Sequence, residues 1–300
     1  MKPIIWLASF PKCGNTWLRL LLANLAAEEA RGINTIGSGD GIASSRQRFD
    51  DACLIASGLL THEECDAMRP ALYRHLAERG GRRAAARDGA GDDPLGAWQW
   101  IKTHDAWTCT TGGEPLLGGG AIARAAVLIV RDPRDVVASL ANHNGQTLEE
   151  AAAMMADSES AFAGRSDRQP LQMRQRLLGW SGYYRSWIEQ DAVPVHVLRY
   201  EDMQAGAANA LGALLAGLGI TVDTTRLERA AQWSAFERVQ AQEAESGFQE
   251  APVKLGAGRF FRSGRSGGWR DELSEDLRAR IESDHAAMMR RFGYLPEGQG

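Results

Sequence analysis

The sequence predicts an α/β fold in which helices flank both faces of a central parallel sheet. Residues 4–8, 126–130 and 193–198 are short apolar runs that suit strands buried on both faces. Segments with leucine or aromatic residues at helical spacing follow each of them. Strands that alternate with such helices favour a doubly wound, three-layer arrangement, whose ligands bind beyond the carboxyl ends of the strands.

The first strand and the first helix enclose a loop that suits phosphate binding. Residues 4–8 are apolar throughout, and Leu18, Leu21, Leu22 and Leu25 fall on one face of the helix that follows. The segment between them reads Ser9-Phe10-Pro11-Lys12-Cys13-Gly14-Asn15-Thr16-Trp17.

Three residues of this loop supply what an anion needs. Gly14 lets backbone N–H groups close on an anion at the positive end of the helix, Lys12 adds a charge, and Thr16 adds a hydroxyl donor. The fold is therefore expected to be P-loop-like. The general nucleoside-triphosphate order, G-x-x-x-x-G-K-[ST], is absent, because the lysine precedes the glycine and Trp17 closes the motif.

The remaining elements are expected from spacing and turn residues. Helices are expected within 54–76, with a start near Thr61, from 133 through Leu140, from Leu148, over 177–188, over 211–218 and over 274–293. A short strand is expected at 98–103, with His104 at its carboxyl end, and core strands at 126–130 and 193–198. Loops or mobile segments are expected near 32–51, 79–97, 144–170 and 243–268.

Bulk properties exclude several classes of protein. The 300 residues, 44% of them hydrophobic, suffice for one domain over 1–300, and the net charge of −4 argues against a general nucleic-acid or anionic-membrane binder. No apolar run approaches the length of a membrane span, and Met1-Lys2-Pro3 leads directly into the first strand. We therefore expect a cytoplasmic protein.

The four cysteines, Cys13, Cys53, Cys65 and Cys109, lack C-x-x-C spacing, so neither a zinc site nor a disulfide framework is indicated. Beside Lys12 and a helix N-terminus, the thiolate of Cys13 would be favoured, although a space-filling role is the preferred interpretation. No cluster of histidine, cysteine and carboxylate residues has ligand spacing, and no metal is expected.

The order Pro-Lys-x-Gly-x-Thr-Trp in residues 11–17 resembles the 5′-phosphosulfate loop of sulfotransferases that use 3′-phosphoadenosine 5′-phosphosulfate (PAPS). Residues 130–139 resemble the 3′-phosphate segment of the same family, which implies that Arg131 and Ser139 hold one phosphate. The alternative is that Arg131 simply pairs with a neighbouring aspartate at the strand end.

Residues 262–270 resemble the family's signature Arg-Lys-Gly-x-x-Gly-Asp-Trp-Lys, with Ser263 in place of the lysine and Gly268 in place of the aspartate. The resemblance implies that Arg262 and Gly264 complete the 3′-phosphate site, with Arg265 as a substitute for the missing charge. It also implies aromatic contacts to adenine. The implied cofactor-binding residues are Lys12, Cys13, Gly14, Asn15, Thr16, Trp17, Arg131, Ser139, Tyr200, Phe236, Arg262, Ser263 and Gly264.

Residues 101–104, Ile-Lys-Thr-His, resemble the catalytic Lys-Thr-His segment of the family. The resemblance implies that His104 accepts the proton of the acceptor hydroxyl, while Lys12 neutralises the leaving phosphate with help from Lys102 and Thr16. The other histidines are interpreted as surface or packing residues: His62, His75, His143, His196 and His285.

These motifs occur in the family's order and span residues 8–270. They imply a PAPS-dependent sulfotransferase that releases 3′-phosphoadenosine 5′-phosphate (PAP) and acts on a hydroxyl or amine of a small-molecule acceptor. A homo-oligomer stays open. One alternative is a P-loop nucleotide kinase, for which Asp132 is the candidate magnesium ligand. A second is a non-catalytic nucleotide-binding module.

Overall fold

The computed structural model describes residues 1–36, 41–85, 95–165, 170–252 and 259–297. Its central sheet consists of four parallel strands in the order β2-β1-β3-β6. The strands are β1 (Ile4–Ser9), β2 (Gln99–Thr103), β3 (Ala123–Val130) and β6 (Val195–Arg199). The predicted α/β fold with a parallel sheet is confirmed.

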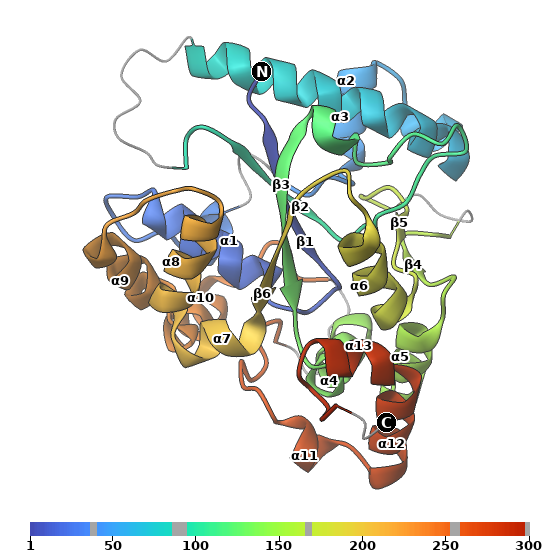
Figure 1. Ribbon diagram of the computed structural model, residues 1–300, viewed down its shortest axis with the longest axis vertical. Coiled ribbons are helices and arrows are strands. Elements are labelled where there is room, and N and C mark those ends of the chain that lie inside the picture. The colour runs from blue at the N-terminus through green and yellow to red at the C-terminus, as the bar shows by residue number, and fades with distance from the viewer. Residues whose placement is uncertain (37–40, 86–94, 166–169, 253–258, 298–300) are drawn as a thin grey trace.

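Helices cover both faces of this sheet (Figure 1). On one side lie α1 (Asn15–Leu25), α7 (Tyr200–Ala205), α8 (Ala207–Gly217), α9 (Thr224–Trp233) and α10 (Phe236–Ser246). On the other side lie α4 (Pro133–Asn144), α5 (Leu148–Ala156), α6 (Gly179–Glu189), α12 (Glu275–Asp284) and α13 (Ala286–Arg291).

The remaining elements lie at the ends of the sheet. Helices α2 (Arg46–Cys53) and α3 (His62–Ala85) lie towards the end where the chain begins, and α11 (Trp269–Glu272) lies at the opposite end. A separate antiparallel pair is formed by β4 (Ala161–Phe162) and β5 (Gln175–Arg176). Three single-turn 3₁₀ helices occupy Ile33–Thr35, Ser57–Leu59 and Gly119–Ala121.

Strand burial follows position in the sheet. Every residue of β1 is buried because β2 and β3 pair on either side of it and helices cover both faces. The expected third core strand is β6, but it pairs only with β3 and lies at the edge of the sheet. Val197 is consequently 46% exposed, so the expectation of a fully covered strand is wrong for β6.

Several expected helices are confirmed with shifted ends. Helix α3 begins at His62, after a Thr61 hydroxyl that accepts the Glu64 N–H, and continues through Ala85. The linker expected from Arg79 is therefore wrong over its first residues, while residues 86–94 lie outside the described chain. The expected single helix over 274–293 is two helices, because the backbone breaks at His285.

Five helices of the described chain lie in segments expected to be loops or left without a prediction: α2, α7, α9, α10 and α11. Both α2 and α9 begin at caps that the sequence contains: the Ser45 hydroxyl accepts the Arg48 N–H, and the Asp223 carboxylate accepts the Thr225 N–H. The expectations of mobility at 37–40, 166–169 and 253–258 fall outside the described residues. In the described part of the chain, no helix is long and apolar enough to span a bilayer.

Substitution of two glycines allows the cost of backbone strain to be measured apart from the cost of steric overlap. Gly113 and Gly179 both have positive φ, of 82° and 65°. A Cβ at Gly113 would meet nothing within 4 Å, whereas a Cβ at Gly179 would lie 2.7 Å from the carbonyl oxygen of Met155. Gly113→Ala should therefore lower the free energy of unfolding by about 1 kcal/mol, and Gly179→Ala by about 3 kcal/mol. Urea denaturation of both variants measures the difference, and equal losses would contradict the overlap.

Candidate active site

One cavity of about 650 Å³ opens at the carboxyl ends of the central strands. It brings together nearly all of the residues that the sequence singled out. Cys13 is the exception. The predicted residues that line the cavity are Lys12, Gly14, Asn15, Thr16, Trp17, Lys102, His104, Arg131, Ser139, Tyr200, Phe236, Arg262, Ser263 and Gly264.

The phosphate loop is held by its own side chains and by a close helix. The Asn15 amide nitrogen donates to the carbonyl oxygen of Leu7 at 2.8 Å and to the hydroxyl of Ser9 at 3.1 Å, so the start of α1 is tied back to β1. Gly14 has a φ of 98°, and a Cβ there would lie 2.6 Å from the ring of Tyr200. Only glycine fits this approach, which leaves the loop's backbone at the wall of the cavity.

The structure does not favour the thiolate form of Cys13 that its neighbours in the sequence suggested. Its side chain is fully buried beneath the loop, where the Tyr184 hydroxyl donates to its sulfur at 3.3 Å. Burial raises the pKa of the Cys13 thiol to about 12, so the favoured thiolate is wrong and the space-filling interpretation holds. Any contact of Cys13 with a ligand must come from its backbone.

Arg131 directly follows the last residue of β3, and its side chain is held in place by backbone oxygens. Its guanidinium donates to the carbonyl of Lys12 at 3.3 Å and to that of Arg265 at 3.1 Å, and it lies 4.2 Å from the ring centroid of Tyr200. Its Nε is buried without a hydrogen-bond partner in the described chain. Among the described residues, no ion pair joins Arg131 to an aspartate, and its hydrogen bonds go to carbonyl oxygens. Ser139 on α4 lines the same cavity.

The two aspartates next to Arg131 serve the protein itself. Asp132 caps α4 and accepts hydrogen bonds from the Arg134 side chain, with a shortest distance of 2.7 Å. Asp135 accepts the backbone N–H of Gly267 at 2.7 Å and that of Trp269 at 3.0 Å, which anchors the C-terminal loop against α4. The carboxylate of Asp132 is thus already paired with the guanidinium of Arg134.

The C-terminal loop closes the same wall. The Tyr200 hydroxyl donates to the carbonyl oxygen of Gly264 at 3.0 Å, and the Arg262 guanidinium pairs with Glu272 at 2.7 Å. Ser263 lines the cavity, whereas the exposed Arg265 contributes only its carbonyl and is not among the lining residues. The expected substitution of Arg265 for the missing lysine therefore finds no support in this geometry.

Aromatic side chains gather where the resemblance implied an adenine site. Trp17 and Tyr200 pack edge to face with their ring centroids 5.6 Å apart, and the Trp17 indole donates to the carbonyl of Ser234 at 2.8 Å. Phe236, at the start of α10, completes this part of the lining. The three rings form an apolar wall between the Lys12 loop and the Arg262 loop.

His104 lies at the base of the cavity in a defined tautomer. Its Nδ1 is 2.7 Å from the carbonyl oxygen of Ser9, which can only accept, so Nδ1 carries the proton. Nε2 forms no hydrogen bond in the described chain and is the free basic nitrogen. Burial, with the charge of Lys102, lowers the pKa of His104 well below 6.5 and keeps the ring neutral.

Two lysines bring positive charge to the same place. Burial, together with the charges of Lys102 and Arg131, lowers the pKa of Lys12 to about 7. The Lys12 ammonium lies 3.4 Å from the ring centroid of Phe260. Burial likewise lowers the pKa of Lys102 to about 8, although Glu250 opposes the shift from 3.6 Å away.

Glu250 and His143 are cavity residues that the sequence did not identify. Arg19 on α1 donates to both carboxylate oxygens of Glu250, at 2.8 and 2.9 Å. Burial alone would raise the pKa of Glu250, but these hydrogen bonds and the charge of Lys102 lower it to about 2. His143 was interpreted as a surface or packing residue; its ring packs against Phe162 and Phe260, and it also lines the cavity.

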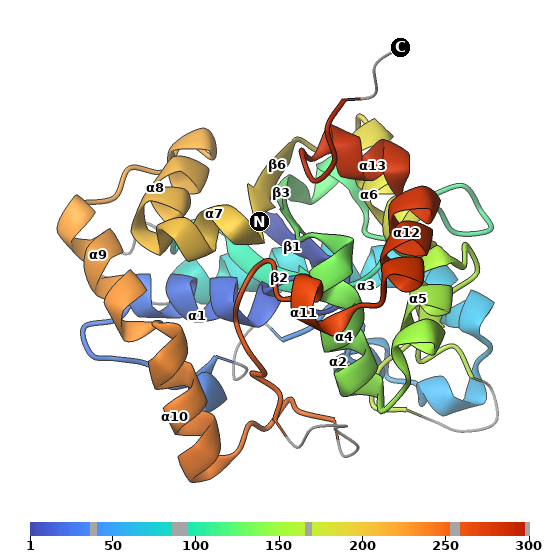
Figure 2. The ribbon, with the colours of Figure 1, turned by 90° about the horizontal axis from the view of Figure 1, so that it is seen from below.

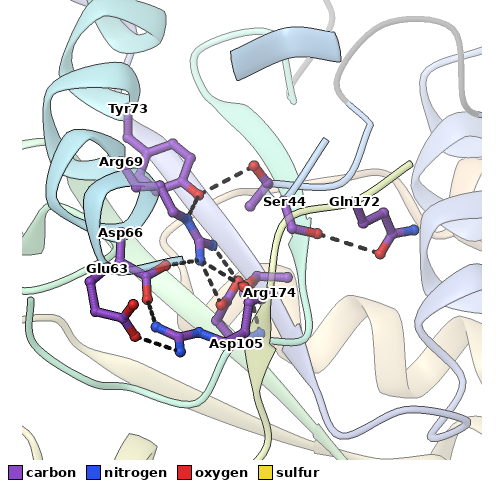
Figure 3. A network of polar contacts seen from close by, with 10 residues as sticks. Ser44, Glu63, Asp66, Arg69, Tyr73, Asp105, Gln172 and Arg174 are labelled. Carbon is purple, nitrogen blue, oxygen red and sulfur yellow. Dashed lines mark hydrogen bonds and ion pairs between the residues drawn. The ribbon is translucent and has the colours of Figure 1, made fainter. Parts of the chain in front are cut away.

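A buried network of charged side chains lies behind His104 and holds in place the turn that carries it (Figure 3). Arg69 on α3 donates to both oxygens of Asp105, at 2.9 and 2.5 Å, and to the Tyr73 hydroxyl at 2.9 Å. Asp66 also contacts Arg69 and accepts a hydrogen bond from Arg174 at 2.6 Å. The residue after His104 is therefore fixed by a fully buried pair of opposite charges.

The same network reaches the wall of the cavity. The Tyr73 hydroxyl donates to the carbonyl of Ala43 at 3.2 Å, and the Ala43 N–H donates to the carbonyl of Lys102 at 2.8 Å. Helix α3 thereby positions the segment around Ile42, which lines the cavity, together with the strand end that carries Lys102 and His104.

Comparison with known proteins places the chain in a family. The profile described as "Sulfotransferase domain" matches residues 125–293, which is more than half of the chain. No curated protein sequence matches it. The chain therefore belongs to the sulfotransferase domain family.

Solved structures share the fold at low sequence identity. Mouse sulfotransferase SULT7A1 complexed with PAP is 16% identical, with a TM-score of 0.57 over 98% of this chain and 86% of that one. Retinol dehydratase with androsterone and inactive cofactor PAP is 16% identical, with a TM-score of 0.51 over 95% and 80%. The complex of retinol dehydratase with retinol and PAP is 15% identical, with a TM-score of 0.55 over 97% and 82%.

The buried pair behind His104 predicts a large difference between two arginines of α3. Arg69→Met strands the Asp105 carboxylate in the interior and should lower the free energy of unfolding by about 3–5 kcal/mol. Arg74 pairs with Glu114 at the surface, where both side chains are more than 40% exposed, so Arg74→Met should cost at most about 1 kcal/mol. Chemical denaturation compares the two variants, and similar losses would contradict a structural role for the network.

Proposed function

We propose that this sulfotransferase moves a sulfuryl group from PAPS to a hydroxyl, or an amine, of a small-molecule acceptor, with His104 as the general base. The observation that carries the proposal is the convergence of the Lys12 loop, Arg131 and the free Nε2 of His104 on one cavity. Residues 1–300 are proposed to act as one domain. A cytoplasmic location and a homo-oligomer remain predictions.

The residues present fit an adenylate with a phosphate at each end. Lys12, Thr16 and the Gly14 loop line one part of the cavity, Arg131, Ser139 and Arg262 line another, and aromatic rings lie between them. The buried Nε of Arg131 lacks a partner in the described chain, and the absence of a side chain at Gly14 lets the ring of Tyr200 pack against the loop. PAPS would supply the activated sulfuryl group.

The chain's own groups then perform general-base and electrostatic catalysis. Hydrogen bonding to Ser9 keeps the proton of His104 on Nδ1, so Nε2 can take the proton of the acceptor hydroxyl. Lys12 and Lys102 line the same cavity, and their positive charge would stabilise the departing phosphate oxygen. The neutral ring of His104 needs no deprotonation before it acts.

The kinase alternative lacks the two features it requires. The loop has no lysine after its glycine, and the carboxylate of Asp132 is occupied by Arg134 and by the start of α4. Titration with PAP against ATP plus magnesium separates the two activities, and a preference for ATP would defeat the proposal. The non-catalytic alternative is separated by the His104 variant below.

Replacing the base should separate turnover from cofactor binding. His104→Ala should lower turnover of PAPS by roughly 10²–10⁴-fold and leave the dissociation constant for PAP within a few-fold of the wild type. His196→Ala, on the edge strand and outside the cavity, is the matched control. Turnover is read as the mass gain of one sulfuryl group across a panel of hydroxyl and amine acceptors. Unchanged turnover in His104→Ala would remove His104 from the mechanism.

PAP binding should also take up protons from solution at alkaline pH. Since the pKa of Lys12 is about 7 in the free protein, Lys12 is mostly neutral at pH 8, and a nearby phosphate raises that pKa. Binding at pH 8 should therefore absorb up to about one proton, and at pH 6, where Lys12 is already charged, its share should vanish. Calorimetry in buffers of different ionisation enthalpy measures the uptake. Lys12→Met should remove most of it, and a buffer-independent enthalpy for the wild type at pH 8 would contradict the prediction.

A further inference from the structure

A carboxylate that the proposed function does not use lies against the 3′-phosphate part of the cavity. Glu272 is the last residue of α11, and its Oε2 lies 2.7 Å from Nη1 of Arg262, which lines the cavity. The side chains of Arg262 and Glu272 are 29% and 30% exposed, so the ion pair is open to solvent. An acidic residue thus neutralises an arginine that is proposed to bind phosphate.

Helix α11 holds Glu272 in a fixed place beside this part of the cavity. The Asp135 carboxylate accepts two backbone N–H groups at and just before the start of α11. The ring of Trp269 is buried, and its centroid lies 4.1 Å from the guanidinium carbon of Arg134. Both contacts join α11 to the first turn of α4, which closely follows Arg131 in the chain. The carboxylate is therefore carried by a turn that is anchored to the Arg131 segment.

The guanidinium of Arg262 keeps a donor that no group of the described chain uses. Its Nε is buried without a hydrogen-bond partner, and the same is true of the Nε of Arg131. A phosphate presents three acceptor oxygens and nearly two negative charges to such donors, whereas a carboxylate presents two oxygens and one charge. The ion pair with Glu272 is thus a contact that a bound phosphate can replace.

This chain has little positive charge to spare at the 3′-phosphate. Ser263 stands where the family's signature has a lysine, and the exposed Arg265 contributes only its carbonyl oxygen. Among the described lining residues, Arg131 and Arg262 remain as the cations proposed to hold this phosphate. A carboxylate that competes for one of them therefore removes a large part of the attraction.

We propose that Glu272 is a specificity residue for the donor, which competes with the 3′-phosphate for Arg262. In the free protein the carboxylate pairs with the guanidinium, and when PAP or PAPS binds, the guanidinium turns to the phosphate. Loss of the ion pair offsets part of the gain from the new contact, so Glu272 reduces the preference for ligands that carry a 3′-phosphate. This inference rests on the proposed sulfotransferase function.

The test compares two probes that differ only in the 3′-phosphate. PAP and adenosine 5′-monophosphate (AMP) are titrated by calorimetry into the wild type and into Glu272→Gln, which keeps the shape of the side chain and an acceptor oxygen but loses the charge. The variant should bind PAP roughly three- to fivefold more tightly, as expected for the loss of a competing solvent-exposed ion pair, and AMP with unchanged affinity. Glu275→Gln is the matched control, because it removes a carboxylate from an exposed pair with Arg278, and it should change neither affinity.

A second background tests whether the effect passes through Arg262. In Arg262→Met, the further change Glu272→Gln should alter the affinity for PAP by less than about twofold, because the shared partner is gone. An equal gain in both backgrounds, or binding of PAP that is unchanged or weaker in Glu272→Gln, would overturn the inference. If the wild type binds PAP in those cases, the sulfotransferase proposal survives, whereas a wild type that does not bind PAP would remove the proposed function itself.

Discussion

Positive charge buried with too few partners is the constraint on which the rest of this cavity depends. Burial and mutual repulsion lower the pKa of Lys12 to about 7 and that of Lys102 to about 8. In the described chain, Glu250 pairs with Lys102, while Lys12 rests on an aromatic ring and Arg131 on carbonyl oxygens. An anionic ligand supplies the missing compensation, so the cavity is built to favour phosphate and sulfate groups over neutral ones.

Directly behind the cavity, by contrast, the buried charges are fully paired. Arg69 and Asp105 are completely buried, yet each is satisfied by the other and by neighbouring hydrogen bonds (Figure 3). Figure 2, seen from below, shows α1 and α4 on opposite sides of the sheet, with the segment that leads into α11 running between them in this view. The ion pair of Arg69 and Asp105 holds the carboxyl end of β2 in place. The positive charges of Lys12 and Arg131, which have no carboxylate partner in the described chain, face the cavity. The buried pair behind the strand ends therefore stabilises the fold, whereas Lys12, Lys102 and Arg131 line the cavity in front of them.

Much of this was predictable because its signals are local. The phosphate loop, the parallel strands and the order of motifs follow from spacing within a few residues, and the structure gathers every predicted lining residue except Cys13. The caps of the missed helices α2 and α9 were also local signals, whereas the failures at Cys13 and β6 depend on distant contacts. A charge beside Cys13 suggested a low pKa, but burial under Tyr184 decides it. Composition cannot tell how many neighbours a strand has, so β6 was taken for a core strand.

Glu250 and His143 were missed for the same reason. Glu250 reaches the cavity only because Arg19, 231 positions earlier in the chain, holds its carboxylate. His143 follows Ser139 by one helical turn, which was the available signal: a residue on the same helical face as a phosphate ligand faces the same cavity. The rings that pack against it, Phe162 and Phe260, come from distant segments, so the sequence around His143 gives no indication of these contacts.

The family match and the geometry cover different halves of the site. The matched region, 125–293, contains Arg131 and Arg262, whereas the Lys12 loop and His104 precede it. Ser9 at the end of β1 joins the two functions: its carbonyl accepts the Nδ1 proton of His104, and its hydroxyl accepts a hydrogen bond from Asn15. The start of α1 after the Lys12 loop and the tautomer of His104 are therefore both tied to one residue. The proposed donor loop and the proposed base thus share one anchor at the end of β1, which keeps them in a fixed relation to each other.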